Sequence, residues 1–265
     1  MNYRFLLRLS LLALILLTAV GIIILPVKGF FARTAPSGPG TIFLPLVVKP
    51  SSGLSTAPFP STAILDNFDT ADGSPGAQWG GQTSGYAIRA QRLAAGSGGD
   101  LVWQAAAYGP DQEASVTLNS WDPLTGEFGL LLKSQSPDGW SAGTLRVAYS
   151  SPNQRLEIAT YSPAQGWQSH THALPAAFQV GDQFGARITG DGWLGIYRNG
   201  ALLAEFDLGK WEFHAQGGWI GLWAANASGA VLDDFAGGNL TDTPPQPSPT
   251  PAPSHTSTPL PGSSA

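Results

Sequence analysis

Short segments of alternating apolar and polar residues constrain the fold of this chain most strongly. They fill residues 61–240, where Gly, Pro, Asn and Asp interrupt them repeatedly and no helical amphipathic run of useful length occurs. Ten of these segments are predicted as strands: 114–118, 128–133, 144–149, 155–161, 167–173, 184–188, 193–197, 202–206, 219–223 and 230–235. So many short strands predict an all-β sandwich or barrel rather than a parallel α/β sheet.

Two turns show how neighbouring segments connect. Arg198-Asn199-Gly200 stands between two alternating segments, and Asn-Gly in that position is the strongest short signal for a β-hairpin. Ser150-Ser151-Pro152-Asn153 is a second turn of favourable composition. Because hairpins join antiparallel strands, we expect antiparallel sheets.

Charge and proline divide the chain into four regions. Residues 1–60 contain five basic residues and no acidic one, whereas residues 61–240 contain nearly all of the acidic residues. We predict a signal anchor or signal peptide at 1–33 and a stalk rich in Pro, Ser and Gly at 34–61. A β-sandwich follows at 62–240, and a disordered Pro/Thr/Ser-rich tail at 241–265.

The N-terminal region has the pattern of an export signal. Arg4 and Arg8 precede an apolar run over residues 11–26. Residues 9–25 are just long enough to cross a bilayer, so an uncleaved membrane anchor and a cleaved signal peptide both stay open. In either case we expect an extracytoplasmic domain, attached to the membrane through the N-terminal segment or secreted.

Composition excludes several classes of protein. The chain has no Cys, which excludes a disulfide scaffold, a Cys-based zinc site, an iron–sulfur cluster and a thiol nucleophile. Its 13 basic residues are outnumbered by 18 acidic ones, which argues against a nucleic-acid partner. We expect a monomer held together by its apolar core.

Several motifs follow one another along the predicted sandwich: Ile64-Leu65-Asp66-Asn67-Phe68, Val180-Gly181-Asp182, Arg187, Gly195-Ile196-Tyr197-Arg198-Asn199-Gly200, Gly217-Gly218-Trp219-Ile220-Gly221-Leu222 and Val231-Leu232-Asp233-Asp234-Phe235. Their order resembles the concanavalin A-like lectin and glucanase superfamily, particularly laminin-G-like modules. The resemblance implies a jelly-roll sandwich of two antiparallel sheets, with one concave sheet and with the first and last strands paired. The 3-keto-disaccharide hydrolase-type modules are a further similar branch.

The glucanase branch of that superfamily uses a Glu-x-Asp-x-x-Glu strand, in which alternation places the first two acids on one face. That spacing is absent here, since Glu127 precedes Phe128-Gly129 and Glu157 precedes Ile158-Ala159. The acid pair Asp111 and Glu113 lies beside a turn, where charges are ordinarily solvated. The sequence therefore argues against glycosidase activity without excluding it.

Aromatic residues give the main indication of function. In segment 193–197, Leu194 and Ile196 are the expected core residues, which leaves Trp193 and Tyr197 on the other side. Alternation likewise places Trp219 and Trp223 opposite the core. Arg146 and Glu157 are expected on the same non-core face. Flat rings with little charge between them suit stacking on sugar rings.

Three functions are compatible with these residues. The preferred one is a non-catalytic binding module for a glycan or another extracellular polymer, using the aromatic face. The alternatives are a glycoside hydrolase and an adhesive or scaffold module that binds protein. A competing structural interpretation is that a loop or the stalk covers these rings and makes a second small core.

The sequence contains two candidate metal sites. Asp66, Asp69, Asp233 and Asp234 lie near the two ends of the domain, so pairing of the end strands would gather carboxylates suited to Ca²⁺. His170 and His172 place two imidazoles on one strand face, a spacing that binds zinc or copper when a third ligand is present. Turn capping and an exposed polar face are the respective alternatives.

Overall fold

A computed structural model describes residues 53–54, 57–124, 126–170 and 174–240. The predicted export segment, most of the predicted stalk and the predicted tail lie outside these ranges, and so does His172. Within the described ranges, no helix is both long enough and apolar enough to cross a membrane.

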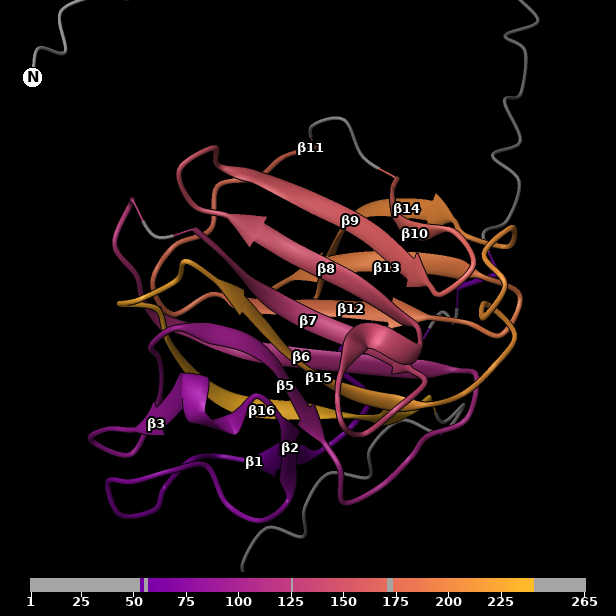
Figure 1. The fold of residues 1–265 in the computed structure, drawn as a ribbon. Coiled ribbons are helices and arrows are strands. Elements are labelled where there is room, and N and C mark those ends of the chain that lie inside the picture. Colours follow the sequence, from indigo (N-terminus) through magenta and orange to yellow (C-terminus); the bar gives the residue numbers. More distant parts are fainter. Residues whose placement is uncertain (1–52, 55–56, 125, 171–173, 241–265) are drawn as a thin grey trace, which may run out of the picture. The chain divides into compact units, whose positions relative to one another are not determined.

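The described residues form a sandwich of two antiparallel sheets, and sheet B lies in front of sheet A in Figure 1. Sheet A has the order β14 (Ala201–Asp207), β13 (Trp193–Arg198), β12 (Gln183–Ile188), β6 (Gln112–Ser120), β16 (Val231–Asn239), β4 (Leu93–Ala95) and β3 (Tyr86–Ile88), with β1 (Ile64–Asp66) also paired to β16. Sheet B has the order β10 (Gly166–Ser169), β9 (Arg155–Ser162), β8 (Thr144–Ser150), β7 (Glu127–Ser134), β15 (Trp219–Ala225), β5 (Gly98–Trp103) and β2 (Trp79–Gly81), with β11 (Leu174–Pro175) also paired to β9. Two short 3₁₀ turns, η1 (Thr83–Gly85) and η2 (Trp140–Ala142), lie in loops.

Strand alternation produces the core between the sheets. Every second residue of a strand points inward, and on the central strands of both sheets these residues are aliphatic or aromatic. The inward residues of β6, β12, β7 and β8 are fully or almost fully buried: Ala114, Val116, Leu118, Phe184, Ala186, Ile188, Phe128, Leu130, Leu132, Leu145, Val147 and Tyr149. The residues between them form two outer faces, one on each sheet.

The structure confirms the predicted all-β jelly-roll class. The first and last strands pair, with Ile64 opposite Ala236. Asn199 and Gly200 have φ angles of 51° and 80° and connect β13 to β14, as their sequence predicts. These left-handed conformations are readily adopted by Asn and Gly.

Two strand predictions differ from the structure. Of the predicted strand 167–173, β10 ends at Ser169, and residues 171–173 lie outside the described ranges; β11 pairs with β9 from Leu174. The strands β2 to β5 between Trp79 and Trp103 were not predicted. Three of the four are only three residues long, and two of the four contain consecutive glycines, so they show little alternation.

Candidate functional site

The predicted aromatic face is divided between the two sheets. Trp193 and Tyr197 lie on β13 of sheet A, whereas Trp219 and Trp223 lie on β15 of sheet B. The expectation that all four rings share one sheet is therefore wrong. Alternation identified the non-core side of each strand correctly, but it carries no information about which sheet a strand joins.

The outer face of sheet A is covered by the chain itself. Tyr197 is only 7% exposed, because the Phe59 ring stacks on it with the centroids 4.1 Å apart and the planes at 5°. Gly185 makes room for this ring, since a Cβ there would lie 2.1 Å from Phe59 Cζ. Trp193 is half-buried, and Gly53 lies close to its indole. On sheet A the chain itself therefore covers the aromatic rings, as the structural alternative to sugar binding expects.

A buried ion pair fixes the covering segment, residues 57–62, which we call the strap. Arg187 Nη2 lies 2.7 Å from Glu113 Oε2, and both side chains are essentially inaccessible. Arg187 also donates hydrogen bonds to the carbonyls of Ala57 and Pro58 at 2.9 and 3.0 Å. Glu113 Oε1 accepts from the backbone N–H groups of Ser61 and Thr62. The last residues of the predicted stalk are therefore packed against the sandwich.

The outer face of sheet B places Arg146 beside two neighbouring indole rings. Its guanidinium carbon lies 5.0 Å from the Trp167 ring centroid and 5.1 Å from that of Trp223, which are cation–π distances. The two indoles are 6.2 Å apart. Trp219 lies on the same side of β15, four residues from Trp223 and opposite Ser134 of β7.

Trp167 belongs to a larger aromatic cluster on this face. Its ring lies 5.3 Å from that of Tyr161 and 5.4 Å from that of Trp140, and Tyr161 and Trp140 are 4.6 Å apart. Trp167 is 37% exposed, so part of this cluster faces solvent. Trp167 was predicted to lie on a strand but was not predicted as a site residue. Its pairing with Tyr161 across the β9–β10 hairpin was the available clue.

Two glutamates lie beside Arg146. Arg146 Nη1 is 3.3 Å from Glu127 Oε2, and Arg155 Nη2 is 2.6 Å from Glu157 Oε1. The carboxyl groups of Glu127 and Glu157 also hydrogen-bond to each other. Glu157 was predicted at the site, whereas Glu127 had been considered only as part of a missing glucanase motif.

The two carboxyl groups have pKa values shifted in opposite directions. Burial raises the pKa of Glu127, and Glu157 raises it further, against the lowering effect of the Arg146 charge. Burial also acts to raise the pKa of Glu157, but hydrogen bonds from Arg155 and Glu127 and the two arginine charges lower it overall. A proton shared by this pair therefore resides mainly on Glu127, while Glu157 is ionised.

Two buried polar atoms on this same face, Asp100 Oδ1 and Arg146 Nε, lack a hydrogen-bond partner among the described residues. The Trp223 side chain, by contrast, hydrogen-bonds to Glu127. Asp100 is paired with Trp223 in the sheet, and its other oxygen accepts from the Trp140 backbone N–H at 3.1 Å. Because buried polar groups are normally bonded, these two atoms are polar groups of the face that the described residues do not satisfy.

The predicted calcium ligands are engaged in other contacts. Asp66 accepts hydrogen bonds from the Phe68 backbone and the Trp79 indole, at 2.8 and 2.7 Å. Asp233 contacts Arg92 at 3.4 Å. Burial and the charges of Asp233 and Asp69 raise the pKa of Asp234. No group of three acidic or histidine side chains in the described ranges is arranged to hold a metal ion, and the calcium site stays a prediction.

His170 has a protein partner of its own. Its Nε2 lies 2.8 Å from Thr160 Oγ1, and burial lowers the pKa of the imidazole. This contact accounts for His170 without a metal ion.

Comparison with known proteins finds similar folds but no relative by sequence. No family model and no curated protein matches the chain. Similar solved structures are concanavalin A-like proteins, among them the carbohydrate-binding module CBM66 of Bacillus subtilis, which is 14% identical over 62% of this chain and 94% of that one, at a TM-score of 0.41. The laminarinase of Rhodothermus marinus is 12% identical over 67% of this chain and 97% of that one, at a TM-score of 0.44. The galectin LEC-6 of Caenorhabditis elegans is 18% identical over 48% of this chain and 79% of that one, at a TM-score of 0.35. At these scores the neighbours carry no argument about the site.

Proposed function

We propose that the outer face of sheet B binds a glycan outside the cytoplasm without cleaving it. The observation that carries the proposal is Arg146, whose guanidinium lies within cation–π distance of both the Trp167 and the Trp223 ring with its Nε unbonded. Flat rings supply stacking surface for a sugar, and guanidinium and carboxyl groups supply hydrogen bonds to hydroxyl groups. The extracytoplasmic location rests on the basic and apolar pattern of residues 1–33, and membrane attachment and the monomeric state stay predictions.

The charge of the face favours an uncharged glycan. Glu127, Glu157 and Asp100 place three carboxyl groups beside the two arginines, so the face has no excess of positive charge. An acidic polysaccharide would bring further negative charge to carboxylates already on the face. Neutral sugars are therefore expected to bind more tightly than uronates.

Binding without cleavage is favoured by the position of the two glutamates. Glycosidases need two carboxyl groups separated by about 5–10 Å, which leaves room for the reacting carbon or for water. Glu127 and Glu157 are hydrogen-bonded to each other instead. A glycoside hydrolase remains the second candidate because of one observation, the raised pKa of Glu127 beside an ionised carboxylate, which is the protonation pattern of an acid–base pair.

Calorimetric titration with a panel of sugars tests the proposal. The panel contains laminarin oligosaccharides, mucin O-glycans and alginate trisaccharide, which include neutral and acidic sugars. We expect a neutral member to bind, Trp167→Ala to weaken it about tenfold, and Trp193→Ala, a matched indole on sheet A, to leave it unchanged. Absence of binding by every member contradicts the proposal. Release of reducing ends that is lost in Glu127→Gln would establish the hydrolase instead.

A further inference from the structure

The lateral edge of the sandwich beside β14 is unusually apolar. Exposed large hydrophobic residues number six in the described ranges, and two of them, Leu202 (44% exposed) and Leu203 (40%), are neighbours on β14. Edge strands are normally protected by lysine, proline or a covering element, because their backbone can pair with another chain.

β14 has only part of that protection, an irregularity at Leu203 where its pairing with β13 shifts register. It is the last strand of sheet A, and no further strand of the described ranges pairs with it. Its sequence contains neither Lys nor Pro, and the first four residues, Ala201–Ala204, carry no charge. The N-terminal half of β14 is therefore suited to accept a further strand.

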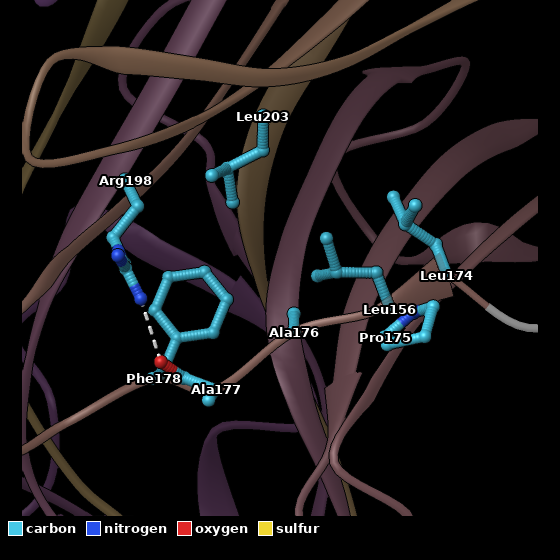
Figure 2. A pocket seen from close by; sticks show the side chains of 8 residues that line it. All are labelled: Leu156, Leu174, Pro175, Ala176, Ala177, Phe178, Arg198 and Leu203. Carbon is cyan, nitrogen blue, oxygen red and sulfur yellow. Dashed lines mark hydrogen bonds between the residues drawn. The ribbon is translucent and has the colours of Figure 1, made fainter.

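A pocket opens beside this strand, in the gap between the two sheets. Its volume is about 190 Å³, and Figure 2 shows aliphatic side chains around it with the Arg198 side chain next to the Phe178 ring. Leu174 and Pro175 of β11 lie on the sheet B side, and Leu203 of β14 lies on the sheet A side. A side chain that enters from the edge would complete the apolar layer between the sheets.

Arg198 gives the pocket a positive rim. Its Nη1 donates a hydrogen bond to the Ala177 carbonyl at 2.7 Å, which holds the guanidinium in place. None of the carboxylates in the described ranges forms an ion pair with it. A guanidinium beside an apolar pocket is complementary to a ligand that combines an aliphatic group with a carboxylate.

We propose that this edge binds an extended peptide of a partner protein by strand addition to β14. The peptide backbone pairs with Ala201–Ala204, one aliphatic side chain enters the pocket, and a carboxylate two residues away meets Arg198. Residues two apart lie on the same face of a strand, about 7 Å from each other, so one extended segment reaches both points. A polysaccharide cannot supply the alternating N–H and C=O groups of a strand. The proposal is independent of glycan binding on sheet B.

An array of nine-residue peptides tests this proposal with the full chain. The peptides consist of Thr and Val, with Leu, Gly or Asp at the fifth position and Asp, Thr or Lys at the seventh. We expect the Leu/Asp peptide to bind best, and each departure from it to weaken binding at least tenfold, as measured by fluorescence anisotropy. Proline at the fourth position should abolish binding, since it cannot donate to the strand ladder.

Protein variants locate the binding on this edge. Leu203→Lys should weaken the Leu/Asp peptide at least tenfold, whereas Leu124→Lys, at a remote exposed leucine, should not. Arg198→Glu should exchange the preference, so that the Leu/Lys peptide binds best. Laminarin oligosaccharides should not displace the peptide. Failure of the Leu/Asp peptide to bind at about 1 mM, or binding that Leu203→Lys leaves unchanged, would overturn the proposal.

Discussion

The two outer faces of the sandwich contain the same arrangement of side chains in two different states. On sheet A, the Arg187 guanidinium lies 5.4 Å from the Phe59 ring and 5.6 Å from the Tyr197 ring, and it pairs with Glu113. The strap supplies one of these rings and the carbonyls that complete the hydrogen bonds. Every part of this arrangement is buried.

On sheet B, Arg146 lies within cation–π distance of Trp167 and Trp223 and pairs with Glu127. The loop with η2 covers only part of this face, where Trp140 packs on Tyr161 and Trp167 and its backbone N–H bonds to Asp100. The Arg146 Nε is left without a partner, and Trp167 is partly exposed. The comparison indicates what each arrangement is for. The described chain buries the first arrangement completely and the second only in part, which is why the first is assigned to stability and the second is the proposed binding site.

The largest expected effect of a single change is on the buried ion pair of sheet A. Glu113→Ala leaves the Arg187 charge buried without its carboxylate, which should lower the free energy of unfolding by about 3–5 kcal/mol. Glu127→Ala, the matched change on sheet B, should cost about 1 kcal/mol or less because its ion pair is partly solvated. Urea unfolding of both variants measures the two losses of stability. Equal losses would mean that the two ion pairs contribute equally to the stability of the fold.

The Phe59 ring of the strap gives the second-largest expected effect on stability. Phe59→Ala removes a ring that is buried against Tyr197 and should lower the free energy of unfolding by about 3 kcal/mol. Trp167→Ala should cost less than half as much, since its ring is partly exposed. Thermal and urea unfolding measure both. A larger loss for Trp167→Ala would show that the cluster on sheet B is a second core.

Removal of the sheet B guanidinium should change binding more than stability. Arg146→Met keeps the length of the side chain but removes its donors, and it should weaken glycan binding about 10- to 100-fold. Arg92→Met, at an exposed arginine beside Asp233, is the matched control and should bind normally. Calorimetry on the glycan that binds the native chain gives both values. Unchanged affinity in Arg146→Met would remove this residue from the site.

The smallest effect concerns pH. Because burial raises the pKa of Glu127 above its ordinary value of 4.5, its contribution to stability is present below that value and is lost as the pH rises through the raised pKa. Glu157, whose pKa is lowered, contributes above that value and loses its contribution as the pH falls. Glu127→Gln should therefore gain stability relative to the native chain as the pH rises above 4.5, measured by urea unfolding at each pH. A constant difference would contradict the assigned protonation.

Local pattern was sufficient to predict much of the fold but only part of the site. Asn199-Gly200 is a turn by its own backbone preference, so the β13–β14 hairpin could be recognised in isolation. Arg146 and Glu157 could be placed on a non-core face because Val147 and Ile158 are core residues. Both results depend only on neighbours in the sequence.

The features that were missed depend on distant parts of the chain. Whether Tyr197 is open or covered is decided by Phe59, which lies far away in a segment that resembles a linker. Glu127 joins the site because β7 and β9 both pair with β8, which brings it to Glu157. An arginine such as Arg187 is ordinarily exposed, and nothing near it in the sequence indicates its burial.

NMR tests the central claim most directly. The measurement follows the indole N–H resonances of the full chain during titration with the best-binding glycan of the panel. The chain has nine tryptophans, each of which gives one such resonance that a Trp→Phe variant can assign. The account predicts that the resonances of Trp167 and Trp223 move with the titration while that of Trp193 stays in place. Movement of Trp193 with Trp167 and Trp223 unchanged would contradict it.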